Sequence, residues 1–84
     1  MKTNKFIYSK NLNFKACMKN PRRETAPVNI SGETYEIVHY RGSNHFYLYG
    51  EGLFPLMTCE SLNSLLRRIN KLLRTSSFQI LHLI

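Results

Sequence analysis

Six large apolar residues recur at helical spacing in the second half of the chain, and this repeat limits the possible folds more than any other feature. They are Leu62, Leu65, Leu66, Ile69, Leu72 and Leu73. At 100° per residue, all six fall on one side of an α-helix. The repeat therefore predicts a helix over residues 59–74 that turns one side to the core, with Thr58 as its N-cap.

The segment before this helix predicts an antiparallel β-hairpin. Residues 28–31 and 34–41 flank the dipeptide Gly32-Glu33. A glycine can adopt the positive φ that a type II′ hairpin turn requires at its first central position. Pairing Ser31 with Thr34 places four apolar side chains on one face of the hairpin. These are Val28, Ile30, Tyr35 and Ile37.

Two further turns extend this hairpin into a meander. Residues 42–44 have the turn-forming sequence Gly-Ser-Asn and lead into a strand over residues 45–49. The sequence Gly-Glu-Gly at residues 50–52 breaks that strand before the apolar residues 53–57. We therefore expect an antiparallel meander of three to five strands.

The remaining segments complete the predicted architecture. Residues 14–18 alternate in polarity and are a candidate first strand, whereas the β-compatible residues 78–83 are a candidate last strand. Two prolines and a polar composition predict a linker over residues 20–27. The 84 residues then form one α+β domain: a small antiparallel sheet with one amphipathic helix packed on one face. Residues 1–26 are its basic N-terminal arm and linker, and residues 27–84 are its core.

Positive charge is concentrated at the beginning of the chain. The protein has 12 Lys and Arg residues against 5 acidic residues, a net charge of +7, and no acid precedes Glu24. The cations of this first stretch are Lys2, Lys5, Lys10, Lys15, Lys19, Arg22 and Arg23. Like charges repel unless a counter-charge relieves them, so this run favours an anionic partner such as nucleic acid.

The predicted helix carries a second basic group, made of Arg67, Arg68, Lys71 and Arg74. Arg67, Lys71 and Arg74 fall on one side, opposite the leucines, and form a ridge suited to the phosphates of a nucleic acid. The alternative is a solvated helix face whose cations match the negative end of the helix dipole. Polyanion binding is favoured because it accounts for both basic groups.

Two tyrosines of the strand over residues 45–49 are candidate base-stacking residues. If Phe46 and Leu48 face the helix, strand alternation turns Tyr47 and Tyr49 to the other side, near Arg41. Aromatic rings beside a cation on an open sheet face can stack on bases. Tyrosine is also an ordinary half-buried strand residue, which is the alternative explanation.

No pattern in the chain predicts catalysis, a metal site or a cofactor. Cys59 falls in the first turn of the predicted helix, where the helix dipole stabilises a thiolate, but no base and orienting acid accompany it. Packing is the simpler role for this cysteine. The cysteines and histidines lack metal-ligand spacing, and the chain has neither a glycine-rich phosphate loop nor an aspartate. We therefore expect a protein that is not an enzyme.

We expect a binding protein whose partner is nucleic acid or a nucleic-acid-processing complex. The candidate binding residues are Lys5, Lys10, Lys15, Lys19, Arg22, Arg23, Arg41, Tyr47, Tyr49, Arg67, Arg68, Lys71 and Arg74. Two cysteines without a secretory hydrophobic region favour the reducing cytoplasm. No apolar stretch approaches the roughly 20 residues of a membrane-spanning helix, so no membrane partner is expected.

Three alternatives remain open from the sequence. The protein could antagonise or assemble with a partner through an acidic protein surface, form a homodimer through an open strand edge, or belong to a ribosome-associated particle. In size and pattern the chain resembles small phage- or plasmid-encoded modulators of host machinery, including anti-CRISPR proteins. This resemblance implies an inhibitor encoded by a phage or mobile element.

Overall fold

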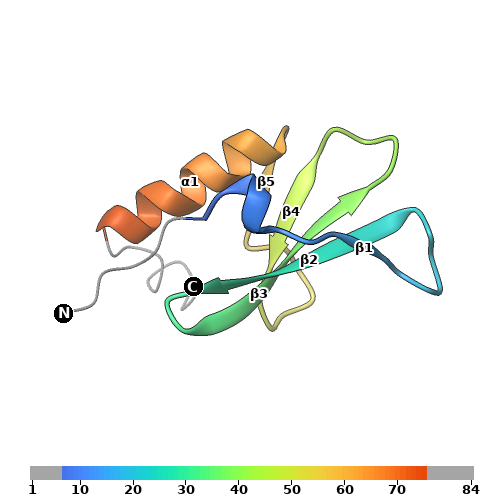
Figure 1. The fold of residues 1–84 in the computed structure, drawn as a ribbon, viewed down its shortest axis with the longest axis horizontal. Coiled ribbons are helices and arrows are strands. Elements are labelled where there is room, and N and C mark those ends of the chain that lie inside the picture. Colours follow the sequence, from blue (N-terminus) through green and yellow to red (C-terminus); the bar gives the residue numbers. More distant parts are fainter. Residues whose placement is uncertain (1–6, 76–84) are drawn as a thin grey trace.

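Five antiparallel strands and one long helix form the fold of the described residues (Figure 1). The computed structural model describes residues 7–75. Along the chain the elements are η1 (Ser9–Asn11), β1 (Lys15–Ala16), β2 (Arg23–Ile30), β3 (Glu33–Tyr40), β4 (Phe46–Tyr49), β5 (Met57–Cys59) and α1 (Leu62–Thr75). Each strand pairs with the next, so the sheet is a meander with the order β1-β2-β3-β4-β5. The predicted α+β fold, with one helix packed against a small antiparallel sheet, is confirmed.

The leucine-rich side of α1 is buried, as the sequence predicts. Four of its side chains belong to the core, and the other two pack against that core as partly buried residues. The four are Leu65, Leu66, Ile69 and Leu73, and the two are Leu62 and Leu72. Burying one such side chain contributes about 1.5–3 kcal/mol, so this stripe is the main attachment of α1 to the sheet.

The helix begins later than predicted, because Ser61 caps it. The Ser61 hydroxyl accepts a hydrogen bond from the Ser64 backbone N–H at 3.1 Å, and the Ser61 carbonyl accepts one from the Leu65 N–H at 3.1 Å. Thr58, the expected N-cap, lies instead in β5, where it is exposed between two buried neighbours. Pairing with β4 holds this segment in an extended conformation, which excludes it from the helix.

The β2–β3 hairpin turns one residue earlier than predicted. Ile30 pairs with Glu33, so Ser31 and Gly32 are the central residues of the turn. Their φ angles are 54° and 87°. Two positive φ values belong to a type I′ turn and not to the expected type II′ turn. Each β2 residue therefore pairs two positions away from its expected partner, an even shift that keeps the predicted apolar face intact.

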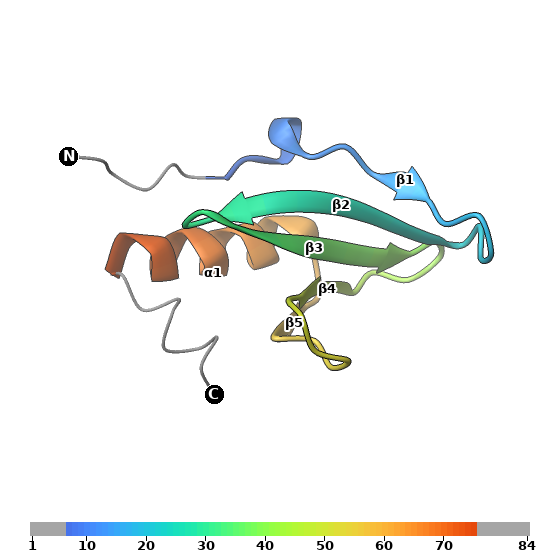
Figure 2. The same cartoon turned by 90° about the horizontal axis from the view of Figure 1, so that it is seen from below.

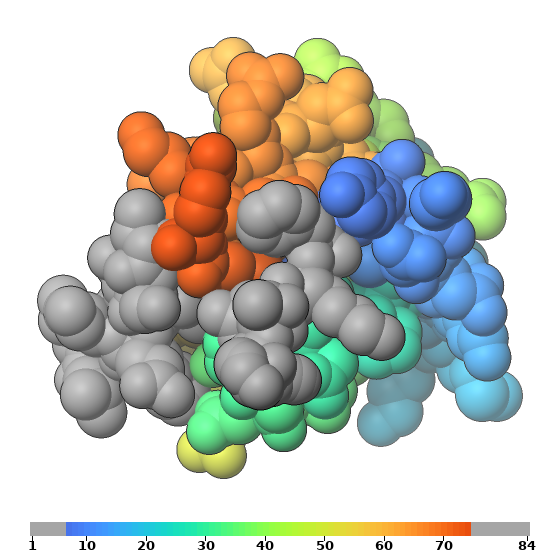
Figure 3. Space-filling view, turned by 60° about the vertical axis from the view of Figure 1, so that its left-hand side comes forward, coloured from blue at the N-terminus to red at the C-terminus, as the bar shows by residue number. Residues whose placement is uncertain are grey.

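The described part of the N-terminal region packs against the core. Ile7 is 6% exposed, and Asn70 of α1 holds its backbone with two hydrogen bonds, of 2.8 and 2.9 Å. The chain then runs alongside β2 and pairs with it through β1 (Figure 2), and η1 lies against α1 (Figure 3). Residues 1–6, which include Lys2 and Lys5, and the candidate last strand over residues 78–83 lie outside the described residues.

The expected linker over residues 20–27 is wrong, because β2 begins at Arg23 and includes Pro27. In a hairpin with a two-residue turn, the residues that flank the turn, here Ile30 and Glu33, form a hydrogen-bonded pair. Alternate backbone N–H groups of β2 therefore point to β3, and the backbone nitrogen at position 27 faces away from it. β1 pairs only with residues 24 and 25. Pro27 therefore lies on an open part of this edge, where the absence of an N–H removes no ladder hydrogen bond.

The apolar residues 53–57 do not form the expected strand. Leu53 and Phe54 are 89% and 81% exposed and belong to the loop between β4 and β5. Only Met57 enters β5, where it pairs with Leu48 of β4. The residues before Met57 form the loop in which the chain reverses direction between β4 and β5, so they cannot also extend the sheet. The first strand is shorter than expected as well, since β1 has two residues.

The sheet has one covered face and one open face. The core lies between α1, the N-terminal segment and the covered face, to which the strands contribute Val28, Ile30, Tyr35, Ile37, Leu48, Met57 and Cys59. On the opposite face, most side chains of β2, β3 and β4 are exposed or half-buried. On that open face, described side chains of several strands meet.

Candidate nucleic-acid interface

The open face of the sheet carries three tyrosines and two cations. Strand register places them there: Val38 pairs with Tyr47, and residues two positions away on each strand share that face, whereas Leu48 faces the core. We call this surface the tyrosine face and define it by Lys15, Arg23, Tyr40, Tyr47 and Tyr49. Tyr47 and Tyr49 therefore point away from the core, as the alternation predicted.

The three tyrosine rings form a continuous row. The ring centroids of Tyr40 and Tyr47 are 6.2 Å apart with an interplanar angle of 79°, and those of Tyr47 and Tyr49 are 6.5 Å apart at 45°. Val38 lies among them on the same face and is fully buried. The rings thus have a packing role, yet Tyr40 remains 36% exposed and the other two are only half-buried.

The cations of the tyrosine face adjoin this row. Arg23 is directly opposite Tyr40 across the β2–β3 pair, and Lys15 continues the face onto β1. Within residues 7–75, neither cation forms a salt bridge with a carboxylate. Glu36, opposite Tyr49, is the one acidic strand residue that the register assigns to this face in the described part of the chain. Positive charge therefore gathers at the β1 side of the tyrosine row.

The turn between β1 and β2 adds two more cations at the same end of the sheet. Arg23 closes this turn by donating its N–H to the Asn20 carbonyl at 2.9 Å and accepting from the Cys17 N–H at 2.7 Å. The backbone N–H of Asn20, then that of Lys19, and the nearby Arg23 side chain lower the pKa of the Cys17 thiol. Met18 at the tip is 97% exposed. We call this turn the basic tip and define it by Lys19 and Arg22, which are both exposed.

Arg41 does not join the tyrosines, contrary to the expectation that they would lie near it. Its Nε lies 3.9 Å from Glu24 Oε1, and the other oxygen of Glu24 is 2.8 Å from His39 Nδ1. His39 Nε2 is 2.7 Å from the Ser43 carbonyl oxygen, and the ring stacks on Phe46 at 4.2 Å. Register assigns Glu24, His39 and Phe46 to the covered face. This cluster stabilises the β3–β4 turn.

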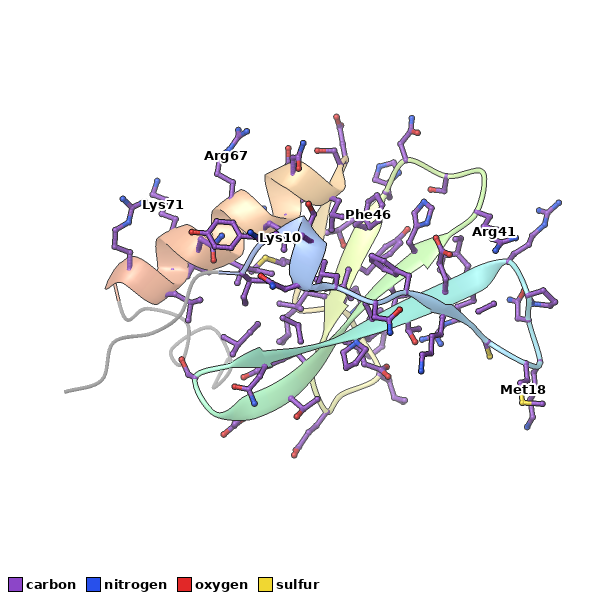
Figure 4. All side chains as sticks on the ribbon, in the orientation of Figure 1. Lys10, Met18, Arg41, Phe46, Arg67 and Lys71 are labelled. Atoms are coloured by element: carbon purple, nitrogen blue, oxygen red, sulfur yellow. The ribbon has the colours of Figure 1, made fainter. Side chains whose placement is uncertain are left out.

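The cations of α1 form a second basic surface at the other end of the molecule. We call it the helix ridge and define it by Arg67, Lys71 and Arg74, all of which are exposed. Lys10 lies on η1, which packs against α1. Figure 4 shows Arg67 and Lys71 toward one end, and Met18 and Arg41 at the opposite end. The fold therefore divides the N-terminal basic run between two distant surfaces.

Cys59 is a core residue and does not lie at the start of the helix, where the sequence placed it. Cys59 is the last residue of β5 and is 7% exposed. Its Sγ lies 3.9 Å from Nη1 of the Arg68 guanidinium. This contact turns Arg68 toward β5 and away from the helix ridge. The expected position of Cys59 in the first turn of the helix is therefore wrong, whereas its burial agrees with the packing role preferred from the sequence.

Sequence reasoning missed two exposed residues: Tyr40 of the tyrosine face, and Met18 in the turn that carries the basic tip. Tyr40 could have been found, because it lies two positions after Val38 on the same strand and therefore shares its face. Met18 gave no such signal, since its apolar character suggested a strand and not the tip of a turn.

Three further observations concern the kind of site and the relatives of the chain. Within residues 7–75, no three His, Cys, Asp or Glu side chains are grouped as a metal site would require. Among the described helices, none has the length and apolar character needed to cross a membrane. No protein-family model matches the chain, and comparison with curated proteins and with solved structures gave no significant match.

Proposed function

We propose that this protein binds nucleic acid, alone or within a nucleoprotein complex, and catalyses no reaction on it. One observation carries the proposal. Four cations of the tyrosine face and the basic tip have no carboxylate partner within residues 7–75 and adjoin a row of accessible aromatic rings. They are Lys15, Lys19, Arg22 and Arg23.

The fold does not supply the missing counter-charge at this end. Glu24, the nearest acid in the sequence, is held on the other face by His39 and Arg41. Four like charges on one hairpin repel each other, and an external polyanion relieves that repulsion. Phosphates bound by Lys and Arg release condensed counterions, which makes such binding favourable and dependent on salt.

A salt titration tests the proposal. The affinity of the full chain for labelled single-stranded and duplex oligonucleotides would be measured by fluorescence anisotropy from low to moderate salt. For a single strand, log K falls with log salt by about 0.7 for each phosphate neutralised. We expect a steep negative slope. Absence of any binding at low salt would refute the proposal.

Two matched double variants locate the site. Lys19→Gln with Arg22→Gln removes two charges from the basic tip, and Arg67→Gln with Arg74→Gln removes two from the helix ridge. The tip variant should flatten the single-strand slope by about 1.4, since two phosphate contacts are lost. The ridge variant is the control of equal charge. Identical binding by the wild type and the tip variant would exclude the basic tip from the interface.

A second candidate function is binding to a partner protein through apolar contacts, which the loop between β4 and β5 favours. Leu53 and Phe54 are almost fully exposed there, and adjacent exposed apolar side chains are typical of protein–protein contacts. Capture of the same partner protein after complete nuclease treatment, and its loss with Phe54→Ser but not with the basic-tip variant, would favour this function over nucleic-acid binding.

A further inference from the structure

We propose that the tyrosine face takes single-stranded nucleic acid in preference to duplex, by stacking unpaired bases on Tyr40, Tyr47 and Tyr49. This inference rests on the proposed nucleic-acid binding and adds the class of ligand. It assigns to Tyr40 and Arg23 roles on one continuous surface, which the tertiary structure alone brings together.

The spacing of the rings fits an extended strand. Centroid separations of 6.2 and 6.5 Å are roughly twice the 3.4 Å rise per nucleotide within a duplex strand. Bases that remain stacked on one another are therefore too close together to match successive rings. The rings are also inclined by 79° and 45°, so each would receive a base separately. A single strand with splayed bases meets both conditions.

The charge on this surface fits the backbone of the same strand. Arg23 lies across the β2–β3 pair from Tyr40, and Lys15 lies one strand further out. A strand whose bases cover the tyrosines can therefore place its phosphates along Arg23 and Lys15 and continue toward the basic tip. Stacking platforms beside a positive groove are the usual means of binding single strands without sequence preference.

A duplex presents far fewer base faces to the tyrosine face than a single strand does. Its base faces are covered by neighbouring base pairs, so the rings could reach only base edges or the backbone. Phosphate contacts from Arg23, Lys15 and the basic tip would remain. We therefore expect duplex binding to be weaker and indifferent to the tyrosines.

Three ligands of equal charge test the inference on the full chain: a thymine single strand, an abasic phosphodiester of the same length, and a duplex presenting the same number of phosphates. Tyrosine emission gives a direct readout, because the protein has five tyrosines and no tryptophan and stacked bases quench the rings. We expect the thymine strand to bind about tenfold or more tighter than the abasic strand and to quench the emission.

Paired variants separate stacking from packing. Tyr40→Leu with Tyr47→Leu removes two rings and keeps apolar cover over Val38, whereas the corresponding Phe variants keep the rings. Tyr8→Leu is the control for loss of an exposed tyrosine outside the tyrosine face, since Tyr8 is 52% exposed and precedes η1. Melting curves confirm that each variant is folded.

The double Leu variant should lose about tenfold affinity per ring for the thymine strand and almost none for duplex. The double Phe variant and Tyr8→Leu should bind like the wild type. If the wild type binds all ligands equally, or the double Leu variant keeps its single-strand affinity, the inference is overturned while nucleic-acid binding stands. If no ligand binds at low salt, both proposals fail. If the double Leu variant unfolds, the single Tyr40→Leu variant, at the most exposed ring, decides between the same outcomes.

Discussion

Asn70→Ala should detach the N-terminal segment from α1 and lower the stability of the whole protein. The Asn70 side chain forms both hydrogen bonds to Ile7, accepting from its N–H at 2.8 Å and donating to its carbonyl at 2.9 Å. Ile7 is 6% exposed, so water cannot readily replace these partners. The two residues are 63 positions apart in the sequence, which makes this contact a test of the tertiary structure.

Two opposing effects set the magnitude. Two partly buried hydrogen bonds contribute about 2 kcal/mol together. Alanine has a higher helix propensity than asparagine by up to about 0.7 kcal/mol. Asn70→Ala should therefore lower the free energy of unfolding by about 1 kcal/mol. Asn63→Ala on the same helix is the matched control: Asn63 is exposed, and no hydrogen bond of its side chain is found within residues 7–75. This control should gain the propensity term alone.

The measurement compares thermal unfolding of the two variants and amide hydrogen exchange of the wild type and Asn70→Ala. A difference of about 2 kcal/mol between the variants corresponds to about 8–16 °C in Tm for a domain of this size. Exchange at the Ile7 amide should also accelerate in Asn70→Ala. Equal Tm values for Asn70→Ala and Asn63→Ala, with an unchanged Ile7 amide, would refute the described attachment of the N-terminal segment.

Three further predictions follow from individual residues. Ser31→Asn should raise Tm by a few degrees, because asparagine tolerates the φ of 54° at this turn position better than serine; a lower Tm would contradict the type I′ turn. Burial raises the pKa of Tyr35 above its ordinary 10.0, so folding loses stability as pH rises beyond 10, and Tyr35→Phe should remove this part of the alkaline loss in urea titrations. Backbone N–H groups, that of Asn20 first, lower the pKa of Cys17 below 9.0, so iodoacetamide should label Cys17 with a midpoint below pH 9.0 while the buried Cys59 reacts only after unfolding. A Cys17 midpoint at or above 9.0 would contradict the described turn.

Local patterns in the sequence determined the types of element. The apolar repeat of α1 is a local signal, because residues three and four apart share a helix face whatever lies opposite them. The two-residue alternation of β3 and β4 is equally local, and it correctly placed Tyr47 and Tyr49 away from the core. The face of each strand also survived the error in register, because a shift of two positions preserves side-chain direction.

The boundaries and pairings depended on contacts between distant residues. Pairing with β4 decides that residues 57–59 form β5. The hairpin turn is centred on Ser31 and Gly32, and not on Gly32 and Glu33, because Ser31 adopts a positive φ between the two paired strands. The attachment of the described N-terminal segment gave no periodic signal, because it depends on the buried Ile7, on two hydrogen bonds to Asn70 and on a two-residue pairing with β2.

The charge of the chain was evident from the sequence, whereas its division into surfaces was not. A net charge of +7 and an acid-free beginning follow from composition alone. The fold places Lys10 on η1 beside α1 and Arg41 beside Glu24, and it brings Arg23 opposite Tyr40. Each of these placements results from pairing between strands or packing between elements far apart in the chain. Composition therefore determined the excess of positive charge, from which an anionic partner is predicted. The tertiary structure decided which cations share a surface with the tyrosines, because strand register sets which side chains are neighbours across a sheet.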